Sequence, residues 1–354
     1  MALALPAQER ALPRPARPPL WHGLRNTGQV LRIPQVSVVI VNYCLWKETG
    51  RLVRQLSAAP CVRRGAAEVV VVDNHSPTHA LAKRLRRWPG VSLRRWERNR
   101  GFAQAVNEGC RLSQGKWLLL LNPDISVSPD FLDGVLALTE RLSIEEPDAG
   151  IVGFELRNSD GSCQLSSGPF PTLLQTLARL ALPRTRRKYH LLPLRRRCRV
   201  PWVTGCCLLL RRECLNQLGG MDGDFFLYYE DVDLCRRAAD LGWSVCFEPT
   251  LQAIHHHPLH LRAIPAYMRL LTRHALLTYA SKHWPPWQFR LLAHLVQWEA
   301  RVRQYGASRR NDPAAAQLFG QLRAIALDLG LSRQRSAQRR LQQVIRREEQ
   351  RRAS

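Results

Sequence analysis

The sequence lacks any apolar run long enough to cross a lipid bilayer. Its longest uninterrupted apolar runs, such as 117–121, are only five residues long, whereas a membrane-spanning helix needs about 20 residues. Prolines and arginines interrupt residues 1–32, which leaves no apolar run there as long as the core of a signal peptide. We therefore expect neither a transmembrane helix nor a signal peptide, and we expect the protein to be cytoplasmic.

The sequence also lacks the cysteine and glycine patterns of several common sites. Its 10 cysteines include no Cys-x-x-Cys pair, which favours reduced thiols over a zinc ribbon or a disulfide framework. The first apolar strand, 36–41, is followed by Asn42-Tyr43-Cys44 and not by a glycine-rich loop. This excludes the dinucleotide-binding and P-loop fingerprints. The phosphates of a bound nucleotide would then need another partner, most economically a divalent cation.

Acidic residues are scarce relative to basic ones. The chain has 28 Asp and Glu against 53 Lys and Arg, a formal net charge of +25. Four segments account for the whole excess: 1–32, 83–100, 184–199 and 332–354. A nearly neutral body with basic segments fits an anionic membrane surface better than a dedicated nucleic-acid domain. An arginine-rich composition inherited from a GC-rich genome is the alternative explanation.

The pattern that is present is one of alternating strands and helices. The 45% hydrophobic content is ordinary for a globular protein with a sizeable core. Apolar strands are predicted at 36–41, 68–72, 91–96 and 117–121, and helices at 47–57, 78–87, 102–112 and from Pro129. This alternation predicts a parallel α/β sheet. Further on we expect a hairpin at 158–161, a strand at 203–210, a helix at 231–241 and basic helices after 259.

Polar residues follow each of the four predicted strands. Ligands of open parallel sheets bind at the carboxyl ends of the strands. There the sequence offers an aromatic ring, a guanidinium group and two carboxylates, in the clusters Asn42-Tyr43, Asp73-Asn74, Asn99-Arg100-Gly101 and Asn122-Pro123-Asp124. Each cluster alone could be a turn or a cap. Four of them at one edge predict a binding site, with Asp124 as a candidate cation ligand.

A second constellation lies further along the chain. The aromatic-rich run 225–229 precedes three carboxylates, Glu230, Asp231 and Asp233, at the start of a predicted helix. Stabilisation by the helix dipole accounts for Asp233. It does not account for the aromatic run, which would partly desolvate one carboxylate and make it a competent general base. His255 follows 24 residues after Asp231 and opens a histidine triplet.

These motifs, in this order, resemble those of family 2 glycosyltransferases of GT-A fold, in the bacterial rhamnosyltransferase-like branch. The resemblance covers about 34–260 and rests on Val38-Val39-Ile40-Val41-Asn42-Tyr43, Val70-Val71-Val72-Asp73-Asn74, Asn99-Arg100-Gly101-Phe102-Ala103 with Asn107, Leu121-Asn122-Pro123-Asp124, Val203-Thr204-Gly205-Cys206, Gly219-Gly220-Met221-Asp222 and Phe226-Leu227-Tyr228-Tyr229-Glu230-Asp231-Val232-Asp233-Leu234-Cys235 with His255. It implies a mostly parallel, Rossmann-like sheet flanked by helices, with a basic helical extension.

The resemblance also implies three parts of the chain. Residues 1–33 would be a flexible leader, 34–258 the catalytic domain, and 259–354 a basic helical region. Within the catalytic domain, 34–150 would bind the nucleotide and 151–258 would hold the acceptor and the catalytic base.

The resemblance implies a nucleotide site at the strand ends. Asp73 would hydrogen-bond the pyrimidine base, and Tyr43 would lie against it. The other nucleotide-binding residues would be Asn42, Asn99, Arg100, Asn107 and Asn122.

A cation and a base complete the implied site. Asp124 would bind Mg²⁺ or Mn²⁺ at the diphosphate, with His255 as a further ligand. Asp231 would be the catalytic base, and Glu230 the alternative. Two departures from the family pattern are Cys44 after the tyrosine and the His-Pro-Leu-His that follows His255, which leaves open which histidine reaches the metal.

The implied reaction is the inverting transfer of a sugar, with rhamnose suggested by the branch. The donor would be a nucleoside-diphosphate sugar, and the acceptor a hydroxyl of a glycan or a lipid-linked glycan for cell-surface polysaccharide. A sugar nucleotidyltransferase is one rival, but it should carry a glycine-rich loop after the first strand. A non-catalytic basic protein that binds RNA or membranes is the other, although RNA binding would need aromatics among the basic runs. We expect no nucleic-acid partner, and the sequence leaves the oligomeric state open.

One predicted helix suggests how the protein could be held at the inner face of a membrane. Tyr267, Leu270, Leu271 and Leu277 share one helical face, and Trp284 to Trp287 adds aromatics suited to a headgroup boundary. The alternative is that this face packs on the rest of the protein. We predict peripheral attachment through this face and the basic segments.

Overall fold

The computed structural model describes residues 33–178, 194–257 and 264–353. The leader predicted over 1–33 lies outside the described residues apart from its last position. So do most of the basic segment 184–199 and the Pro-Leu-His that follows the histidine triplet.

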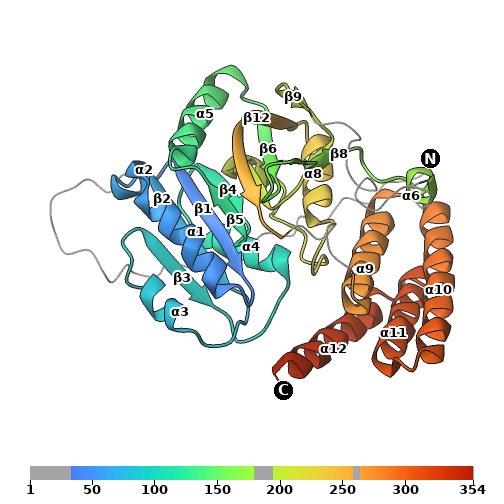
Figure 1. The fold of residues 1–354 in the computed structure, drawn as a ribbon. Coiled ribbons are helices and arrows are strands. Elements are labelled where there is room, and N and C mark those ends of the chain that lie inside the picture. Colours follow the sequence, from blue (N-terminus) through green and yellow to red (C-terminus); the bar gives the residue numbers. More distant parts are fainter. Residues whose placement is uncertain (1–32, 179–193, 258–263, 354) are drawn as a thin grey trace, which may run out of the picture. The chain divides into compact units, whose positions relative to one another are not determined.

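Ten of the described strands form one sheet at the centre of the fold (Figure 1). Eight of them follow the order β3-β2-β1-β4-β11-β6-β12-β5, while β7 pairs with β6 and β9 with β12 beside this path. Its first four strands are mutually parallel, as predicted: β1 (Val36–Asn42), β2 (Ala67–Asp73), β3 (Val91–Arg95) and β4 (Trp117–Leu121). Strand β11 (Cys207–Arg211) runs antiparallel between β4 and β6 (Ala149–Arg157). Strand β12 (Ser244–His255) is parallel to β6, and the short β5 (Ile125–Val127) pairs antiparallel with its end. Strand β9 (Cys198–Arg199) also pairs with β12.

Helices cover both faces of the sheet, which is why its strands are apolar throughout. Alternate residues of β1 enter opposite cores: Val38 and Ile40 face one, and Val39 and Val41 face the other. The first core is covered by α1 (Trp46–Ala58), α2 (Pro60–Arg63), α3 (Ala80–Leu85) and α5 (Phe131–Glu145). The second is covered by α4 (Phe102–Leu112), α7 (Arg212–Gln217) and α8 (Glu230–Asp240). The expected α/β architecture is confirmed.

Two local predictions differ from the structure, and one agrees. The strand predicted over 203–210 is interrupted: β10 (Trp202–Val203) pairs with β8 (Ser167–Gly168), and β11 starts only at Cys207. The break occurs where the backbone N–H groups of Thr204 and Gly205 bond outside the sheet. Helix α5 begins at Phe131, two residues after Pro129. The predicted hairpin is present, between β6 and β7 (Cys163–Gln164).

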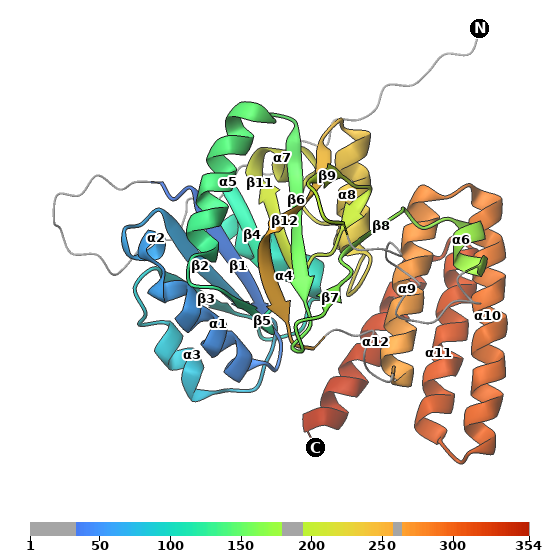
Figure 2. The ribbon, with the colours of Figure 1, turned by 45° about the horizontal axis from the view of Figure 1, so that its top comes forward.

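The C-terminal part is a helical region with its own apolar core. It comprises α9 (Ala266–His283), α10 (Pro286–Arg309), α11 (Pro313–Gly330) and α12 (Gln334–Ala353), and α6 (Leu173–Ala178) adds Leu173 to the core. Figure 2 shows α9, α10 and α11 side by side, and α12 running from them toward the sheet. No described helix is long and apolar enough to span a membrane.

The apolar face predicted to bind a membrane is part of this core. Leu270, Leu271 and Leu277 are at most 2% exposed and pack against α10, α11 and α12. The basic side chain of Arg273, near this face, forms an ion pair with Glu299 of α10 and so does not point to a membrane. The membrane prediction for this face is therefore wrong, and the packing alternative is right.

Candidate active site

The carboxyl ends of β1 and β2 place Asn42 beside Asp73, as parallel register requires. The Asn42 amide donates to Asp73 Oδ1 at 2.7 Å. Arg95, the last residue of β3, donates through Nε to Asp73 Oδ2 at 2.9 Å. Asp73 is fully buried, so both carboxylate oxygens are already held by protein groups. Its predicted contact with a pyrimidine base stays a prediction.

Arg95 is not among the residues predicted from the sequence, although the strand register contains a signal for it. Residues 73 and 95 are register partners on neighbouring parallel strands, so a strand prediction one residue more accurate would have paired them. The guanidinium also reaches the carbonyl oxygen of Ser76 at 2.9 Å and lies over the ring of Trp46. Arg95 thus ties the ends of β2 and β3 to the start of α1.

The loop after β3 is locked against the loop that precedes α8. The Asn74 amide donates to Asn99 Oδ1 at 2.7 Å, and the backbone N–H of Arg100 donates to Asn74 Oδ1 at 2.9 Å. Gly101 has φ +90°, and a Cβ there would lie 2.7 Å from the carbonyl oxygen of Phe226. Only glycine permits this approach without strain. The two predicted motifs are therefore neighbours in space, which their sequence positions do not reveal.

Asn107 has a structural partner. Its amide donates to the carbonyl of Met221 at 2.7 Å and accepts from the N–H of the same residue at 2.8 Å. The neighbouring Gly220 has φ +94°, and a Cβ there would lie 2.8 Å from Asn107 Oδ1, so glycine lets the turn approach the Asn107 side chain. Asn107 thus fastens the 219–222 turn to α4, and its predicted nucleotide contact stays a prediction.

The end of β12 brings His255 to Asp124, as predicted. His255 pairs with Ile125 in the β5–β12 ladder, and its Nε2 lies 3.5 Å from Asp124 Oδ2. Burial opposes ionisation of Asp124, but hydrogen bonding and charge from His255 outweigh it and hold the pKa of Asp124 below its usual value. On the other side of the ring, Nδ1 of His255 is 3.0 Å from Nε2 of Gln164.

The two adjacent histidines lie differently. His256 Nε2 is 2.8 Å from the Ser126 hydroxyl, and its Nδ1 is 3.0 Å from the Ser159 hydroxyl. His257 is exposed. Two members of the triplet act on Asp124: His255 Nε2 lies 3.5 Å from its Oδ2, and the charge of His257 also lowers the pKa of Asp124.

Asp124 and His255 fit a divalent cation as part of its coordination shell. No group of three or more His, Cys, Asp or Glu side chains in the described ranges could hold a metal ion. A carboxylate and an imidazole at 3.5 Å are nevertheless suitable donors, and Mg²⁺ or Mn²⁺ commonly takes its remaining ligands from substrate phosphates and water. The pair is thus suited to a cation that arrives with a diphosphate.

Asp231 lies at the first turn of α8 with 6% of its surface exposed. The N–H of Gly205 donates to its Oδ2 at 3.1 Å, and the N–H of Val232 donates to its Oδ1 at 2.9 Å. Both contacts are donated by backbone N–H groups to the carboxylate, and the predicted role of Asp231 as the base stays a prediction. Glu230, the alternative base, is the first residue of α8 and is equally buried.

The turn of α8 is reached through two residues with left-handed backbone. Tyr228 has φ +74° and Tyr229 has φ +65°. Such conformations are uncommon for aromatic residues and cluster at functional sites. Both tyrosines pack against the second apolar core, and the predicted wall of a pocket stays a prediction.

Residues 204–206 connect the turn that carries Asp124 to Asp231. The carbonyl of Cys206 accepts from the N–H of Asn122 at 2.9 Å, and the N–H of Gly205 donates to Asp231. Asn122 is half-buried at the turn that carries Asp124. The interruption of the predicted strand at 203–210 is therefore what connects the two halves of the site.

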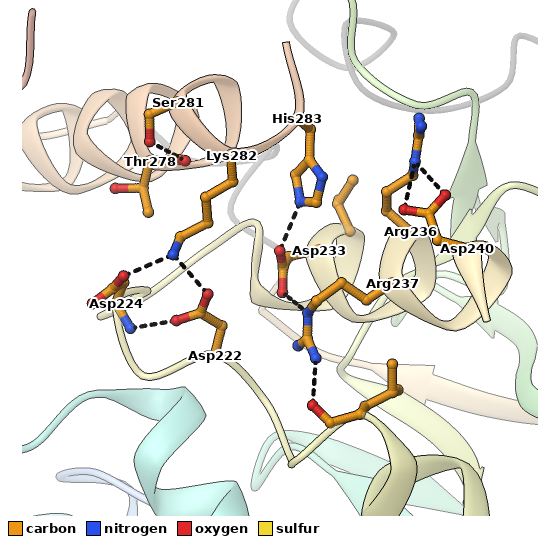
Figure 3. A network of polar contacts seen from close by, with 12 residues as sticks. Asp222, Asp224, Asp233, Arg236, Arg237, Asp240, Thr278, Ser281, Lys282 and His283 are labelled. Carbon is orange, nitrogen blue, oxygen red and sulfur yellow. Dashed lines mark hydrogen bonds and ion pairs between the residues drawn. The ribbon is translucent and has the colours of Figure 1, made fainter. Parts of the chain in front are cut away.

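A polar network fixes α8 on its far side (Figure 3). Asp233 is fully buried and accepts from Arg237 Nε at 2.7 Å, while its other oxygen is 2.8 Å from His283 Nε2. Lys282 forms ion pairs with Asp222 at 2.9 Å and with Asp224 at 2.7 Å. The helical region is thus joined to α8 and to the 219–224 turn.

A cavity of about 170 Å³ lies between the loop after β3 and α12. Its lining includes three arginines, Arg98, Arg100 and Arg346, with Phe226, Leu341 and Ile345 on the apolar side. Two carboxylates also line it: Asp224 is paired with Lys282, and Glu349 accepts from the Tyr43 hydroxyl at 3.4 Å. Within the described part of the chain, none of the three arginines forms an ion pair. The contribution of α12 was not predicted.

Comparison with known proteins identifies relatives of this architecture. A family model described as "Glycosyltransferase like family 2" matches residues 34–276. The N-acetylglucosaminyl-diphospho-decaprenol L-rhamnosyltransferase of Mycobacterium tuberculosis is 30% identical over 241 residues, which are 62% of this chain and 76% of that protein. The low-salt glycan biosynthesis hexosyltransferase of Haloferax volcanii is 26% identical over 246 residues, or 66% and 72% of the two chains.

Among solved structures, a mannosyltransferase from Pyrobaculum calidifontis in complex with GDP-Man and Mn²⁺ resembles this chain at 17% identity. The alignment covers 88% of this chain and 86% of that one, with a TM-score of 0.48.

Proposed function

The chain belongs to the family 2 glycosyltransferases, and from that premise we propose that it transfers a sugar, with inversion, from a nucleoside-diphosphate sugar to a hydroxyl group of an acceptor. The observation that carries this proposal is the bridge of residues 204–206. It links the turn of Asp124 to the carboxylate of Asp231 through two backbone hydrogen bonds. In this proposal the turn that would hold the leaving group and the carboxylate that would accept the proton are both hydrogen-bonded to one short segment.

The edge formed by β1, β2 and β3 supports binding of the donor. Tyr43 supplies an aromatic face, and the Asn42–Asp73–Arg95 cluster supplies directed polar groups beside it. Asp124 and His255 would hold a divalent cation, which when bound neutralises charge on the departing diphosphate. Arg100 is exposed on the same loop as Asn99 and adds positive charge there.

Asp231 would act as the base in a single displacement. Its carboxylate accepts the proton of the acceptor hydroxyl while that oxygen bonds to the anomeric carbon. The bond between the anomeric carbon and the diphosphate breaks in the same step, and the nucleoside diphosphate leaves with the bonding electron pair. One base suffices, because no covalent sugar–enzyme intermediate forms. The backbone N–H groups that donate to Asp231 fix the direction of its carboxylate.

The relatives support rhamnose as the donor sugar and a lipid-linked glycan as the acceptor. The mycobacterial relative is named for L-rhamnosyl transfer to N-acetylglucosaminyl-diphospho-decaprenol, and a further relative is the rhamnosyltransferase WbbL of Escherichia coli. The cavity beside α12 supports an acceptor or donor group that carries phosphate, because it combines three arginines with an apolar wall. A lipid-linked acceptor would keep the enzyme at the cytoplasmic surface of a membrane.

The test is a panel of nucleotide sugars, with release of the product nucleotide as the readout. We expect turnover with a deoxythymidine- or uridine-diphosphate sugar, no turnover in excess chelator, and recovery with Mg²⁺ or Mn²⁺. Asp231→Asn should lower turnover at least ~100-fold while nucleotide affinity stays unchanged, because the amide cannot accept a proton.

Two results would contradict parts of this proposal. Full activity in chelator would remove the role given to Asp124 and His255. An active Asp231→Asn variant together with an inactive Glu230→Gln variant would move the base to Glu230. Release of no nucleotide from any member of the panel would contradict sugar transfer itself.

A further inference from the structure

The outward face of α10 carries a continuous stripe of large apolar side chains. Its six members are between 36% and 67% exposed: Trp287, Leu291, Leu295, Trp298, Val302 and Tyr305. At 3.6 residues per turn they fall within an arc of about 80°. The opposite face is the one that packs in the core, through Leu292, Val296 and Ala300. Helix α10 is therefore apolar on two faces, and only one of them is covered.

Basic side chains flank this stripe. Arg290, His294 and Arg301 are exposed along one side of it, and the Arg309 guanidinium lies 5.5 Å from the ring centre of Tyr305. The one acidic residue of α10, Glu299, is turned inward, where it accepts from Arg273 at 2.7 Å and from Arg303 at 2.8 Å. The outward face thus combines apolar and basic groups without a carboxylate.

The stripe is more than the usual scatter of exposed apolar residues. Single exposed hydrophobics are normal on soluble proteins, whereas a contiguous row along one helix marks an interaction surface. Figures 1 and 2 both show α10 at the edge of the helical region that is farther from the sheet. A partner there would leave the candidate active site uncovered.

Charge decides between the two simplest partners. Spacings of three and four residues from Leu291 to Tyr305 would suit a coiled coil with a second copy of the chain. Two such faces would bring only basic flanks together, with no acidic residue to pair them. An anionic lipid surface satisfies both features, because it accepts apolar side chains and attracts the arginines, and Trp and Tyr favour the headgroup boundary.

We propose that the outward face of α10, residues 287–305, binds the surface of an anionic membrane and lies in its plane. This surface rests on the proposed function, in which a lipid-linked acceptor is used at a membrane. It replaces the buried face of α9, which cannot reach a lipid without opening the helical core.

The experiment is flotation of the full chain with liposomes of neutral phosphatidylcholine alone or with 30% phosphatidylglycerol (about a third anionic lipid, enough to create a negative surface). The double variant Trp287→Ser/Trp298→Ser removes two anchors from the stripe. Its matched control is Ile144→Ser/Leu241→Ser, which removes two exposed apolar side chains of α5 and of the α8 end. A second pair compares Arg290→Gln/Arg301→Gln with Arg54→Gln/Arg63→Gln, which lie outside the four basic segments, all four arginines being exposed.

We expect the wild type to float with anionic liposomes only, and less as salt rises. Each α10 variant should lose at least tenfold in partitioning, while each control changes less than twofold. Thermal unfolding midpoints show whether a variant has folded. Equal partitioning of α10 variants and controls, or no flotation of the wild type, would overturn the proposal. So would a concentration-dependent dimer in lipid-free solution that the tryptophan variant abolishes.

Nucleotide release in lipid-free solution separates this proposal from the proposed function. The α10 variants should release product nucleotide from a soluble donor at the wild-type rate. A wild type that floats but never turns over a nucleotide sugar would leave the surface standing and contradict sugar transfer. A wild type that turns over a nucleotide sugar but does not float would contradict the membrane surface on α10 and leave sugar transfer standing.

Discussion

At the scale of single residues, Gln164 stands out because it contacts the ring that faces Asp124. It is 4% exposed, and its Oε1 is buried without a hydrogen-bond partner among the described residues. With its nitrogen toward His255 Nδ1, the proton of a neutral ring sits on Nε2 and points at Asp124. A half-turn of the amide would let Oε1 accept from Nδ1–H and free the Nε2 lone pair for a cation.

We predict that Gln164→Leu weakens Mn²⁺ binding by 10- to 100-fold, the range typical for loss of a group that orients a metal ligand. Titration calorimetry with Mn²⁺ in the presence of UDP measures it. Affinity for UDP in excess chelator should not change, because Gln164 contacts the ring and not the nucleotide edge. Gln252→Leu, on the exposed side of β12, is the matched control. Equal Mn²⁺ affinity in both variants would show that Gln164 does not orient His255.

The residues that could be predicted from sequence are those that end strands. Asp73 and Asp124 each follow an apolar run, so their position at one sheet edge follows from parallel topology alone. Their partners could not be predicted in the same way. Gln164 lies on a two-residue strand, and Glu349 lies on the last helix, 306 positions from Tyr43. Contacts at such separations depend on how elements pack, which a local pattern does not encode.

At the scale of elements, α12 is the helix that changes the candidate site most. It places Arg346 opposite Arg98 and Arg100 around one cavity. We predict that inorganic pyrophosphate binds there without a cation, since guanidinium groups recognise phosphate oxygens directly. Calorimetry in excess chelator should show binding to the wild type, at least a tenfold loss in Arg346→Gln, and no loss in Arg347→Gln. Arg347 is exposed on the same helix but does not line the cavity.

Saturating UDP then identifies which substrate provides the phosphate. Displacement of pyrophosphate by UDP would assign the cavity to the donor, and binding alongside UDP would assign it to the acceptor. Indistinguishable binding by the two arginine variants would mean that the cavity is not a phosphate site.

Helices in this chain were easier to predict than the surfaces they bury. Periodicity placed α4 and α8 within a residue of their observed bounds, because apolar spacing reports a helix directly. It also offered the Leu270–Leu277 face as a membrane surface, when that face packs inside the helical region. An apolar stripe looks the same in sequence whether a helix or a lipid covers it. On α10 both faces are apolar, and only packing shows which one is left outward.

At the scale of the whole molecule, His274 makes the folding stability of the protein depend on pH. It is buried in α9, and burial lowers its pKa to about 4 from 6.5, with Asp224 opposing this weakly. Its Nε2 has no hydrogen-bond partner among the described residues. The unfolded chain therefore binds a proton on this group between pH 6.5 and 4 that the folded chain does not. The stability due to neutral His274 is full above pH 6.5 and is lost as pH falls through this window.

We predict a decrease of about 3 kcal/mol in the free energy of unfolding between pH 7 and pH 4 from this group alone. His274→Leu should flatten that part of the profile. Carboxylates with lowered pKa values, such as Glu299 at about 2, lose their contribution only at more acidic pH. Burial also lowers the pKa of the partly buried His256, so the comparison of variant with wild type is what isolates His274. Denaturant titrations at half-unit pH steps measure it, and a variant profile parallel to the wild type would contradict the assignment.

The pairing of β5 with β12 has a consequence for how the chain folds. It joins segments about 130 positions apart, as the contact between Ser126 and His256 shows. Closing so long a loop costs entropy before any contact repays it, so pairings of high contact order form slowly. The four parallel strands around β1 are local by comparison and can assemble first. A folding intermediate would then possess the edge formed by β1, β2 and β3 but no Asp124–His255 pair, which would make cation affinity a kinetic reporter of the β5–β12 closure.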